Sequence, residues 1–365
     1  MAFVAVFILS SVSFSFARES TRRSSGPLRK TAGSPISTLV NVNNLAMWIR
    51  ADGWSARNPS TGGSGVLFPR GNPSGVIFAD GLVWTGLVQD GQLPVLRAGG
   101  QTYAIGTVPG RIISKGVAED PGADNVRIWR VRRDFVTADL RQDAADFLDV
   151  AVAKVTDADV KAIRNQYETD WMEWPAEKGA PFYDAGGDGN YTPQFDGQGS
   201  PILFPDADEP GIADADQVVW FVANDLNEGA VRALYGSLSI GLEMQVTLWA
   251  YDRENALGNA IFKRYKLIYK GTSDTPDGST IDNMYIAQWS DPDLGSFGDD
   301  LVGVDTLLNL AYVYNSSPVD EAFESFNLPP PAVGYVFLQG PIVESPGDTA
   351  TFDFPVCGPD TRTSP

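Results

Sequence analysis

The chain has no histidine and a single cysteine, Cys357, among its 365 residues. The absence of histidine excludes the Ser-His-Asp and Cys-His nucleophile systems, His-rich zinc sites and the commonest general base near neutral pH. One cysteine cannot form an intramolecular disulfide, and zinc needs three or four nitrogen or sulfur ligands. Any catalysis would therefore depend on carboxylates, tyrosine, lysine or a metal, and stability must come from the core and from bound ions.

Basic residues are scarce as well. The chain has 27 Lys and Arg against 46 Asp and Glu, which gives a net charge of −19. Nucleic acids and anionic membranes are held chiefly by Lys and Arg, so this composition argues against both as partners. The hydrophobic content of 43% is nevertheless enough to fill a sizeable core.

The N-terminal stretch MAFVAVFILSSVSFSFA, residues 1–17, is an apolar run that ends in small residues. It has the length of a signal-peptide core and is short for a bilayer span, so we expect export and cleavage after Ala17, with a buried strand or a membrane anchor as the alternative. The mature chain would be secreted or at the cell surface, without membrane insertion. Residues 18–38 carry five basic residues among Ser, Gly and Pro, which predicts a flexible leader.

Short apolar runs broken by Gly, Pro and Asn fill residues 39–150 and return in residues 217–354, which predicts two β-rich regions. Within the second, LEMQVTLWAY (242–251) alternates apolar and polar side chains, as a half-buried strand does. We predict a mostly β fold, a β-sandwich or jelly roll rather than a barrel, with long loops rich in Asp and Gly. The tail, 355–365, has no strand pattern and is expected to be irregular and truncated.

Residues 151–216 differ from both β-rich regions. Apolar residues recur at spacings of three and four from Val160 to Trp171 and predict one prominent helix over about 157–174. Thr156 or Asp157 can cap its start, and Pro175 stops it. A loop follows with eight Asp or Glu between Phe182 and Gln217, and no basic residue lies between Lys178 and Arg232.

This first acidic cluster is a candidate calcium site, because like charges disfavour joint ionisation unless a cation or solvent compensates them. DAGGDGNYTPQFD (184–196) matches four positions of an EF-hand loop, but Gly186 stands where a ligand is expected and Phe195 where the bidentate Glu would be. A looser calcium loop or a solvated acidic loop are the two interpretations. The candidate ligands are Asp184, Asp188, Asn190, Asp196, Asp206, Asp208, Asp214 and Asp216.

A second acidic cluster lies in SDPDLGSFGDDLVGVDT (290–306). It falls within residues 271–361, a span that holds fifteen acidic residues and no basic one. A metal site or functional cleft is one interpretation, and ordinary turn chemistry, with Asp binding backbone amides, is the other. The candidate ligands are Asp291, Asp293, Asp299, Asp300 and Asp305.

Paired carboxylates could also hydrolyse a glycosidic bond, if they faced a sugar across a cleft lined by aromatic side chains. Four of the nine tryptophans, Trp48, Trp129, Trp220 and Trp289, lie inside apolar runs and are expected in the core. The other five are candidates for exposed sugar-stacking positions: Trp54, Trp84, Trp171, Trp174 and Trp249.

Several strings resemble the N-terminal region of large bacterial secreted proteins that end in a type IX secretion sorting domain. They include NVNNLAMWIRADGW, GLVWTGLVQDGQ, NQYETDWMEWPAEKGAPFYD, GIADADQVVWFVANDLN and QWSDPDLGSFGDDLVGVDT, and the likeness covers roughly Val40 to Phe354. The resemblance implies a β-rich ectodomain with no assigned activity. In that group an Asp or Asn stands at the position of Gly186, and the chain continues beyond SPGDTATFDF with further β modules.

These observations favour an exported, calcium-stabilised, β-rich module for adhesion or surface assembly, with no catalytic residue and Ca²⁺ as its expected ion. Its expected partners are other surface proteins or further copies of itself, and polysaccharide is a further candidate. The alternative is a secreted carbohydrate-binding module or a carboxylate-dependent glycoside hydrolase.

Overall fold

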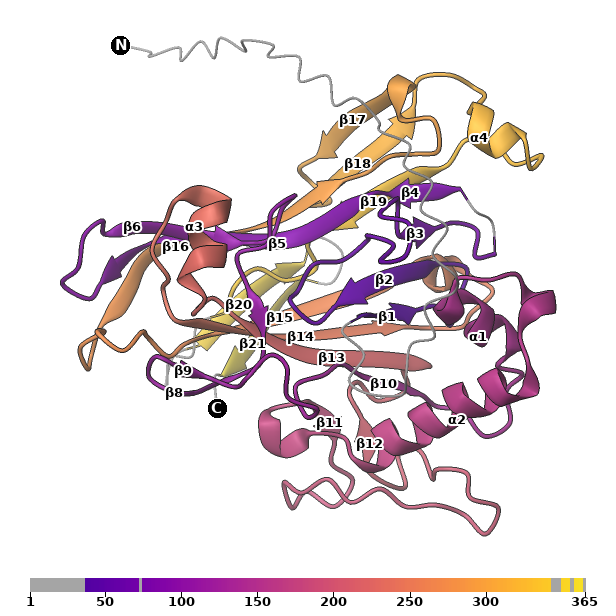
Figure 1. The fold of residues 1–365 in the computed structure, drawn as a ribbon, viewed down its shortest axis with the longest axis horizontal. Helices are drawn as coiled ribbons and strands as arrows, with labels where there is room; N and C mark the ends of the chain where they lie inside the picture. Colours follow the sequence, from indigo (N-terminus) through magenta and orange to yellow (C-terminus); the bar gives the residue numbers. More distant parts are fainter. Residues whose placement is uncertain (1–36, 72–73, 343–348, 355–357, 364–365) are drawn as a thin grey trace. The chain divides into compact units, whose positions relative to one another are not determined.

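The computed structural model describes residues 37–71, 74–342, 349–354 and 358–363 (Figure 1). The fold is mostly β, with 35% of residues in strands and 16% in helices, and it contains several antiparallel sheets, none closed into a barrel. The predicted fold class is thus confirmed. The expected signal peptide and all but the last two residues of the leader lie outside the described residues, and the first strand begins at Ser37.

The central sheet is buried on both faces. Val219 and Phe221 of one strand, β13, point into a core shared with the neighbouring sheet, while Val218 and Trp220 point into a second core shared with the helices. The alternating side chains of β13 are therefore apolar on both sides. The strand order is β10 (Trp129–Arg132), β13 (Gln217–Asn224), β14 (Leu242–Ala250) and β15 (Ile261–Tyr269), with β7 (Val108–Pro109) paired to β13.

The prediction that β14 is only half-buried was wrong. Glu243, Gln245 and Thr247, on its polar face, are all buried. Glu243 accepts hydrogen bonds from Lys270 Nζ at 2.6 Å and from the amide of Ile112 at 2.7 Å, and its neighbour Gln245 lies against Gly179. Polar side chains on a strand therefore do not imply solvent on that face when a loop supplies their partners.

A second pair of sheets lies across the first core. Its longest strands, β5 and β16, pair in antiparallel fashion although about 200 residues separate them in the sequence. Because β5 comes from residues 39–150 and β16 from residues 217–354, the two predicted β-rich regions share a sheet and are not separate modules. The strands are β1 (Ser37–Val40), β2 (Ala46–Arg50), β3 (Val66–Leu67), β4 (Gly75–Ile77), β5 (Ala79–Gln89), β6 (Leu96–Gly100) and β16 (Thr280–Asp291).

The predicted helix is confirmed as α2, Asp157–Met172. Thr156 caps it in a capping box with Asp159, and the apolar stripe from Ile163 to Trp171 packs on β10 (Figure 1). The short helix α1 (Arg141–Leu148) was not predicted, since its buried apolar side chains are only two alanines. The remaining helices among the described residues are α3 (Glu228–Tyr235) and α4 (Glu321–Glu324), with 3-10 turns η1 (Val152–Lys154), η2 (Ala176–Lys178), η3 (Ala256–Asn259) and η4 (Phe297–Asp299). None of the described helices has the length and apolar character needed to cross a membrane.

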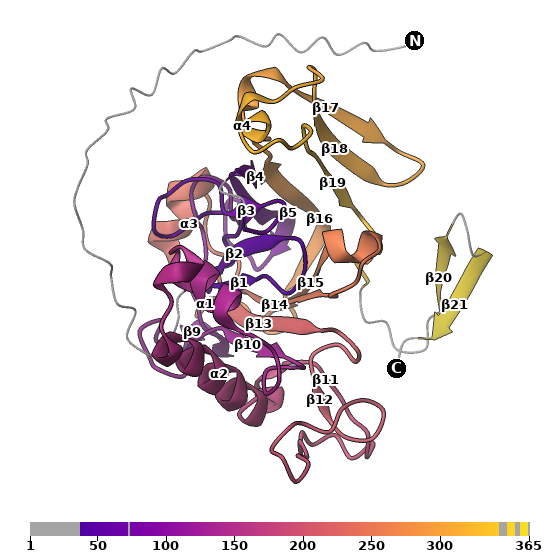
Figure 2. The same cartoon turned by 90° about the vertical axis from the view of Figure 1, so that its right-hand side faces the viewer.

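A three-stranded outer sheet follows β16 in the sequence, with the order β17 (Asp300–Asp305), β18 (Leu310–Asn315) and β19 (Ala332–Val336). Val313, Val333 and Tyr335 of β18 and β19 pack against a third core cluster that includes Met47 and Leu294. Of these three strands, β17 lies farthest from β5 in both views (Figures 1 and 2). The outer sheet is thus anchored through β18 and β19, with β17 at its outer edge.

Three hairpins complete the described strands. One of them corrects the expectation of an irregular tail, because the described part of that tail is the strand β21, paired with β20. The pairing gives the backbone groups of this segment partners in a ladder, in which Gly358 pairs with Phe354. The pairs are β8 (Ile112–Ser114) with β9 (Val117–Ala118), β11 (Phe182–Tyr183) with β12 (Glu209–Pro210), and β20 (Thr349–Phe354) with β21 (Gly358–Thr363).

Candidate functional site

In the first acidic cluster, Asp184 binds the backbone of its own loop. Its carboxylate accepts hydrogen bonds from the amides of Gly187 at 2.6 Å, Asp188 at 3.2 Å and Gly189 at 2.7 Å. These amides, with that of Gly189 first, lower the pKa of Asp184. Asp188 in turn accepts from the amide of Asn190 at 2.8 Å. The carboxylate oxygens of Asp184 therefore face N–H donors, an arrangement that satisfies its charge without an ion.

Three further members of this cluster have no acidic side chain of that loop as a partner. Asp208 is buried and accepts from the amides of Ala185 at 2.9 Å and Thr192 at 2.7 Å. Asp196 accepts from two amides in its own turn, and Asp206 is exposed. Asp196 and Asp208 therefore bind backbone amides in separate places.

The remaining two, Asp214 and Asp216, are neutralised by arginines from outside the stretch. Arg133 Nη1 lies 2.6 Å from Asp214 Oδ1, and Arg253 Nη1 lies 2.6 Å from Asp216 Oδ2. Sequence reasoning missed both partners, because it searched for basic residues only between Lys178 and Arg232. Within the described ranges, no group of three or more Asp, Glu, Cys or His side chains is arranged to hold a metal ion, and the first cluster does not form a shared calcium shell.

The second cluster has fewer internal partners. Asp293 is half-buried near Asp291 and Asp300, and burial first, then these two charges, raises its pKa to about 6. Asp300 Oδ2 accepts from the amide of Leu294 at 2.9 Å, but its Oδ1 is buried with no hydrogen-bond partner. The same is true of Asn315 Oδ1, on the residue paired with Asp300 across β17 and β18. Two buried oxygen acceptors thus lie on paired residues beside an excess of negative charge.

The other two members take different roles. Asp299 Oδ2 accepts from Asn315 Nδ2 at 3.3 Å, so it lies beside the two unpartnered oxygens. Asp305 is at the far end of β17, where it accepts from the amides of Leu307 at 2.9 Å and Leu308 at 3.1 Å. Asp320, which the sequence did not indicate, accepts from the amides of Ser296 and Phe323 and contributes to a raised pKa of Asp300, after burial and Asp299.

A buried polar network ties the outer sheet to the rest of the fold. Asp80 of β5 is fully buried and forms an ion pair with Lys263 of β15 at 2.6 Å. Tyr335 of β19 donates to Asp80 Oδ2 at 3.0 Å and accepts from Ser290 of β16 at 2.8 Å. No local pattern in the sequence predicts this network, because its members lie up to 255 positions apart.

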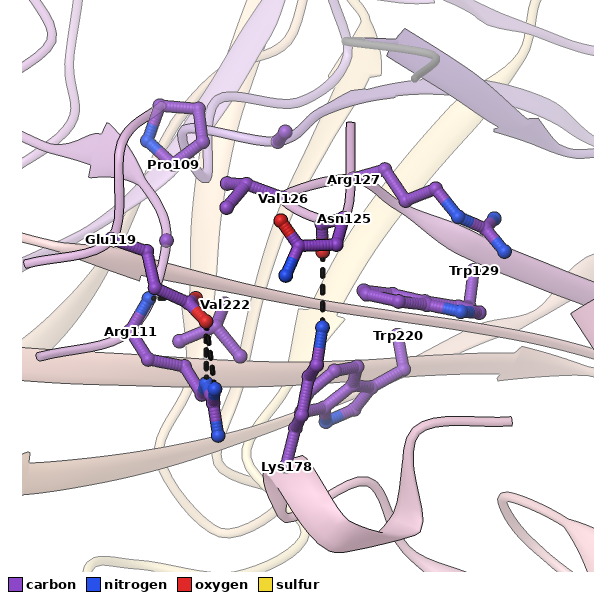
Figure 3. Close-up of a pocket in the computed structure, with 12 residues that line it drawn as sticks. Pro109, Arg111, Glu119, Asn125, Val126, Arg127, Trp129, Lys178, Trp220 and Val222 are labelled. Atoms are coloured by element: carbon purple, nitrogen blue, oxygen red, sulfur yellow. Dashed lines mark hydrogen bonds and ion pairs between the residues drawn. The ribbon is translucent and has the colours of Figure 1, made fainter. Parts of the chain in front are cut away.

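A cleft of about 370 Å³ lies where β10 meets η2 and shares Asn125, Arg127, Trp129 and Lys178 with the smaller pocket of Figure 3. Lys178 Nζ lies 5.1 Å from the ring centroid of Trp129 and donates to the carbonyl of Asn125 at 3.2 Å. Arg127 lies over the same ring at 4.6 Å. The tryptophan is therefore occupied by cation–π contacts and is not an open platform.

Ion pairs also occupy the charged side chains around this cleft. Arg111 pairs with Glu119 at 2.7 Å in the smaller pocket, and Arg127 pairs with Asp170 beneath the cleft. Burial raises the pKa of Asp170 to about 6 against the opposing effect of Arg127. The cleft wall is thus stabilised by its own charges.

The prediction of exposed tryptophans was wrong for three of the five candidates. Trp84, Trp171 and Trp174 are buried, whereas Trp54 and Trp249 are half-buried. Trp249 stacks on Phe262 with ring centroids 5.3 Å apart. All nine tryptophans are buried or half-buried, so none of them is an exposed platform for a sugar ring.

The outer sheet instead exposes a cluster of large apolar side chains. Val302 and Val304 of β17 are 76% and 67% exposed, and Leu307 in the following turn is 81% exposed. We call this cluster the outer apolar surface. Sequence reasoning missed it because such residues are expected in a core. Its members are Leu301, Val302, Val304, Leu307, Leu308, Tyr314, Val336, Phe337 and Leu338.

Comparisons with known protein families, curated proteins and solved structures find no match to this chain.

Proposed function

We propose that this chain is an exported, non-catalytic assembly module that docks another surface protein through its outer apolar surface. The observation that carries the proposal is the gathering of exposed apolar side chains on the three strands β17, β18 and β19 and on the segments that follow β17 and β19. Large apolar side chains exposed together on one sheet are typical of interaction sites on soluble proteins.

Two features favour docking over hydrolysis of a polysaccharide. The carboxylates of the first cluster bind backbone amides or arginines, which leaves them poorly placed to act as an acid and base facing one another. The tryptophans are buried or half-buried, whereas sugar binding needs exposed rings. Polysaccharide therefore ranks below protein as the proposed partner.

Calcium is part of the proposal, at the second cluster rather than the first. Asp300 Oδ1 and Asn315 Oδ1 are buried acceptors without a donor, and Asp293 and Asp299 add negative charge beside them. Calcium takes carboxylate and amide oxygens in flexible geometry, so Asp300 and Asn315 would bind it directly and waters would complete its shell, because no three carboxylates are arranged around one point here. A calcium ion bound there would neutralise the carboxylates at the start of β17 and stabilise the outer sheet.

Site-specific photo-cross-linking in intact producing cells tests the proposal. We expect a photoreactive residue at Val302 to cross-link to one discrete surface protein, while the same residue at Glu228, an exposed helix position, does not. Equal cross-linking at both positions, or none at Val302, would contradict docking through the outer apolar surface. The N-terminal sequence of the exported material should begin at Arg18, and retention of Met1 would refute cleavage.

A further inference from the structure

The hydrogen-bond register shows which backbone groups of β17 are free. Ser316 donates its amide to the carbonyl of Asp299, so Asp299 and every second residue after it turn their peptide groups toward β18. The peptide groups of Val302 and Val304 then point to the opposite edge. Among the described strands, β17 pairs with β18 alone. Its outer edge is therefore an unpaired row of donors and acceptors.

The side chains of β17 are those of a strand covered on both faces. Val302 and Val304 lie on the face that carries Val313 and Tyr335 to the third core, while Leu301 lies on the other face with Tyr314. All three β17 side chains are exposed. Apolar residues on both faces are typical of strands inside a sheet, and exposed apolar edge strands are the ones that natural proteins protect from pairing.

Charge disfavours a second copy as the occupant of this edge. Pairing of two β17 strands centred on Gly303 places Val302 opposite Val304 and brings the aspartates of both copies into one sheet, whereas pairing centred on Val302 places Asp299 of each copy directly opposite Asp305 of the other. Like charges directly opposite one another in a sheet are destabilising, and residues 271–361 contain no basic residue to offset them. The same two aspartates attract a strand that carries Lys or Arg at those positions.

We propose that β17 accepts an antiparallel strand from another protein, with Lys or Arg opposite Asp299 and Asp305 and apolar side chains between them. The two basic residues of that partner strand lie six positions apart. Main-chain hydrogen bonds to Val302 and Val304 supply affinity, and the end charges fix the register. This inference rests on the proposed docking function and specifies the class of its partner.

A synthetic peptide tests it directly. The probe is acetyl-Thr-Lys-Val-Thr-Val-Val-Thr-Lys-Thr-amide, whose lysines would face Asp305 and Asp299. We expect saturable binding to the mature chain, detected by amide chemical shifts that centre on Val302 and Val304. A peptide with Glu in place of both Lys should bind at least about tenfold more weakly. A third peptide, N-methylated at the residues that pair with Val302 and Val304, should lose at least about tenfold as well, because it lacks the pairing amides.

Two proline variants form a matched pair on the protein side. Val302→Pro removes an outward amide without removing a ladder bond to β18, so this variant should bind the lysine peptide at least about tenfold more weakly than the wild type does. Ala332→Pro removes an outward amide from the opposite edge of the outer sheet, outside the outer apolar surface, and this variant should bind the lysine peptide within about twofold of the wild type. Thermal unfolding of both variants controls for loss of the fold.

The outcomes separate this inference from the function on which it rests. If a partner cross-links at Val302 but the N-methylated peptide binds as tightly as the unmethylated one, docking through the outer apolar surface stands and strand addition to β17 is overturned. Equal binding of the Lys and Glu peptides would overturn the charge rule. Dimerisation in analytical ultracentrifugation that Val302→Pro abolishes would assign the edge to a second copy. Peptide binding that appears only after deletion of residues 18–36 would assign it to the chain's own basic leader.

Discussion

Strands β13 and β17 carry similar apolar side chains but have opposite surroundings. All eight residues of β13 are buried, because a sheet covers one face and helices cover the other. The β17 strand has apolar residues on both faces, yet Leu301, Val302 and Val304 are exposed and one edge pairs with no described strand. This difference is the reason for the proposal that another molecule covers β17.

The same substitution in each strand gives the largest contrast. Val219 of β13 is fully buried, so Val219→Ala should lower the free energy of unfolding by about 2 kcal/mol through lost transfer energy and a cavity. Val302→Ala should change it by less than about 0.5 kcal/mol, because the side chain already meets water. Chemical denaturation of both variants measures these values. Equal losses would show that Val302 is covered in the isolated chain.

The next largest effect is expected from calcium bound at the start of β17. Saturation at tenfold the dissociation constant would stabilise the folded state by about 1.4 kcal/mol, and chelation with EDTA should lower the thermal midpoint accordingly. Asp300→Ala should abolish the calorimetric calcium signal, whereas Asp188→Ala should retain it, because the Asp188 loop is satisfied by amides. Identical melting curves in EDTA and in millimolar calcium would contradict the calcium proposal.

Loss of the Tyr335 hydrogen bonds that anchor the outer sheet should have a smaller and local effect on stability. Tyr335→Phe removes the hydrogen bonds to Asp80 and Ser290 and should cost about 1 kcal/mol. We expect faster amide exchange in β17 to β19 and unchanged exchange in β13 and β14. Uniformly faster exchange in both sheets would show that the outer sheet does not open separately.

The smallest expected effect is a pH dependence from Asp293. Its raised pKa means that the folded state binds the proton more tightly than the unfolded state, so this group's contribution to stability falls as the pH rises from about 4 to about 6. Asp293→Asn should remove that slope and stabilise the calcium-free chain at pH 7 by less than about 1 kcal/mol, since solvent screens a half-exposed carboxylate. Urea unfolding at pH 4 and pH 7 compares the variant with the wild type, and an unchanged slope would contradict the assignment.

Local patterns in the sequence predicted local structure well. Helix α2 follows from the spacing of Ile163, Tyr167 and Trp171 and from its cap at Thr156. The mostly β class follows from the short apolar runs. What the sequence could not predict depends on long-range pairing. Burial of Glu243 requires Lys270 and a distant loop, and neutralisation of Asp214 requires Arg133.

The candidate docking surface shows the same limit more sharply. An apolar run such as LVGV reads alike whether it lies inside a sheet or on an exposed edge, because local propensity does not record which neighbours cover a strand. Both acidic clusters were candidate metal sites in the sequence, but the buried oxygens without a hydrogen-bond partner lie in the second, on Asp300 and Asn315. The pairing of Asp300 with Asn315 across β17 and β18 brings these two residues together.

Hydrogen exchange at single residues of β17 tests the central claim most directly. In the isolated mature chain, the amides of Leu301 and Gly303 should be protected by β18, while those of Val302 and Val304 should exchange close to the rate of an unstructured peptide. Addition of the lysine-ended peptide should then protect Val302 and Val304. Protection of all four amides in the isolated chain would show that the edge is already covered and would contradict the account.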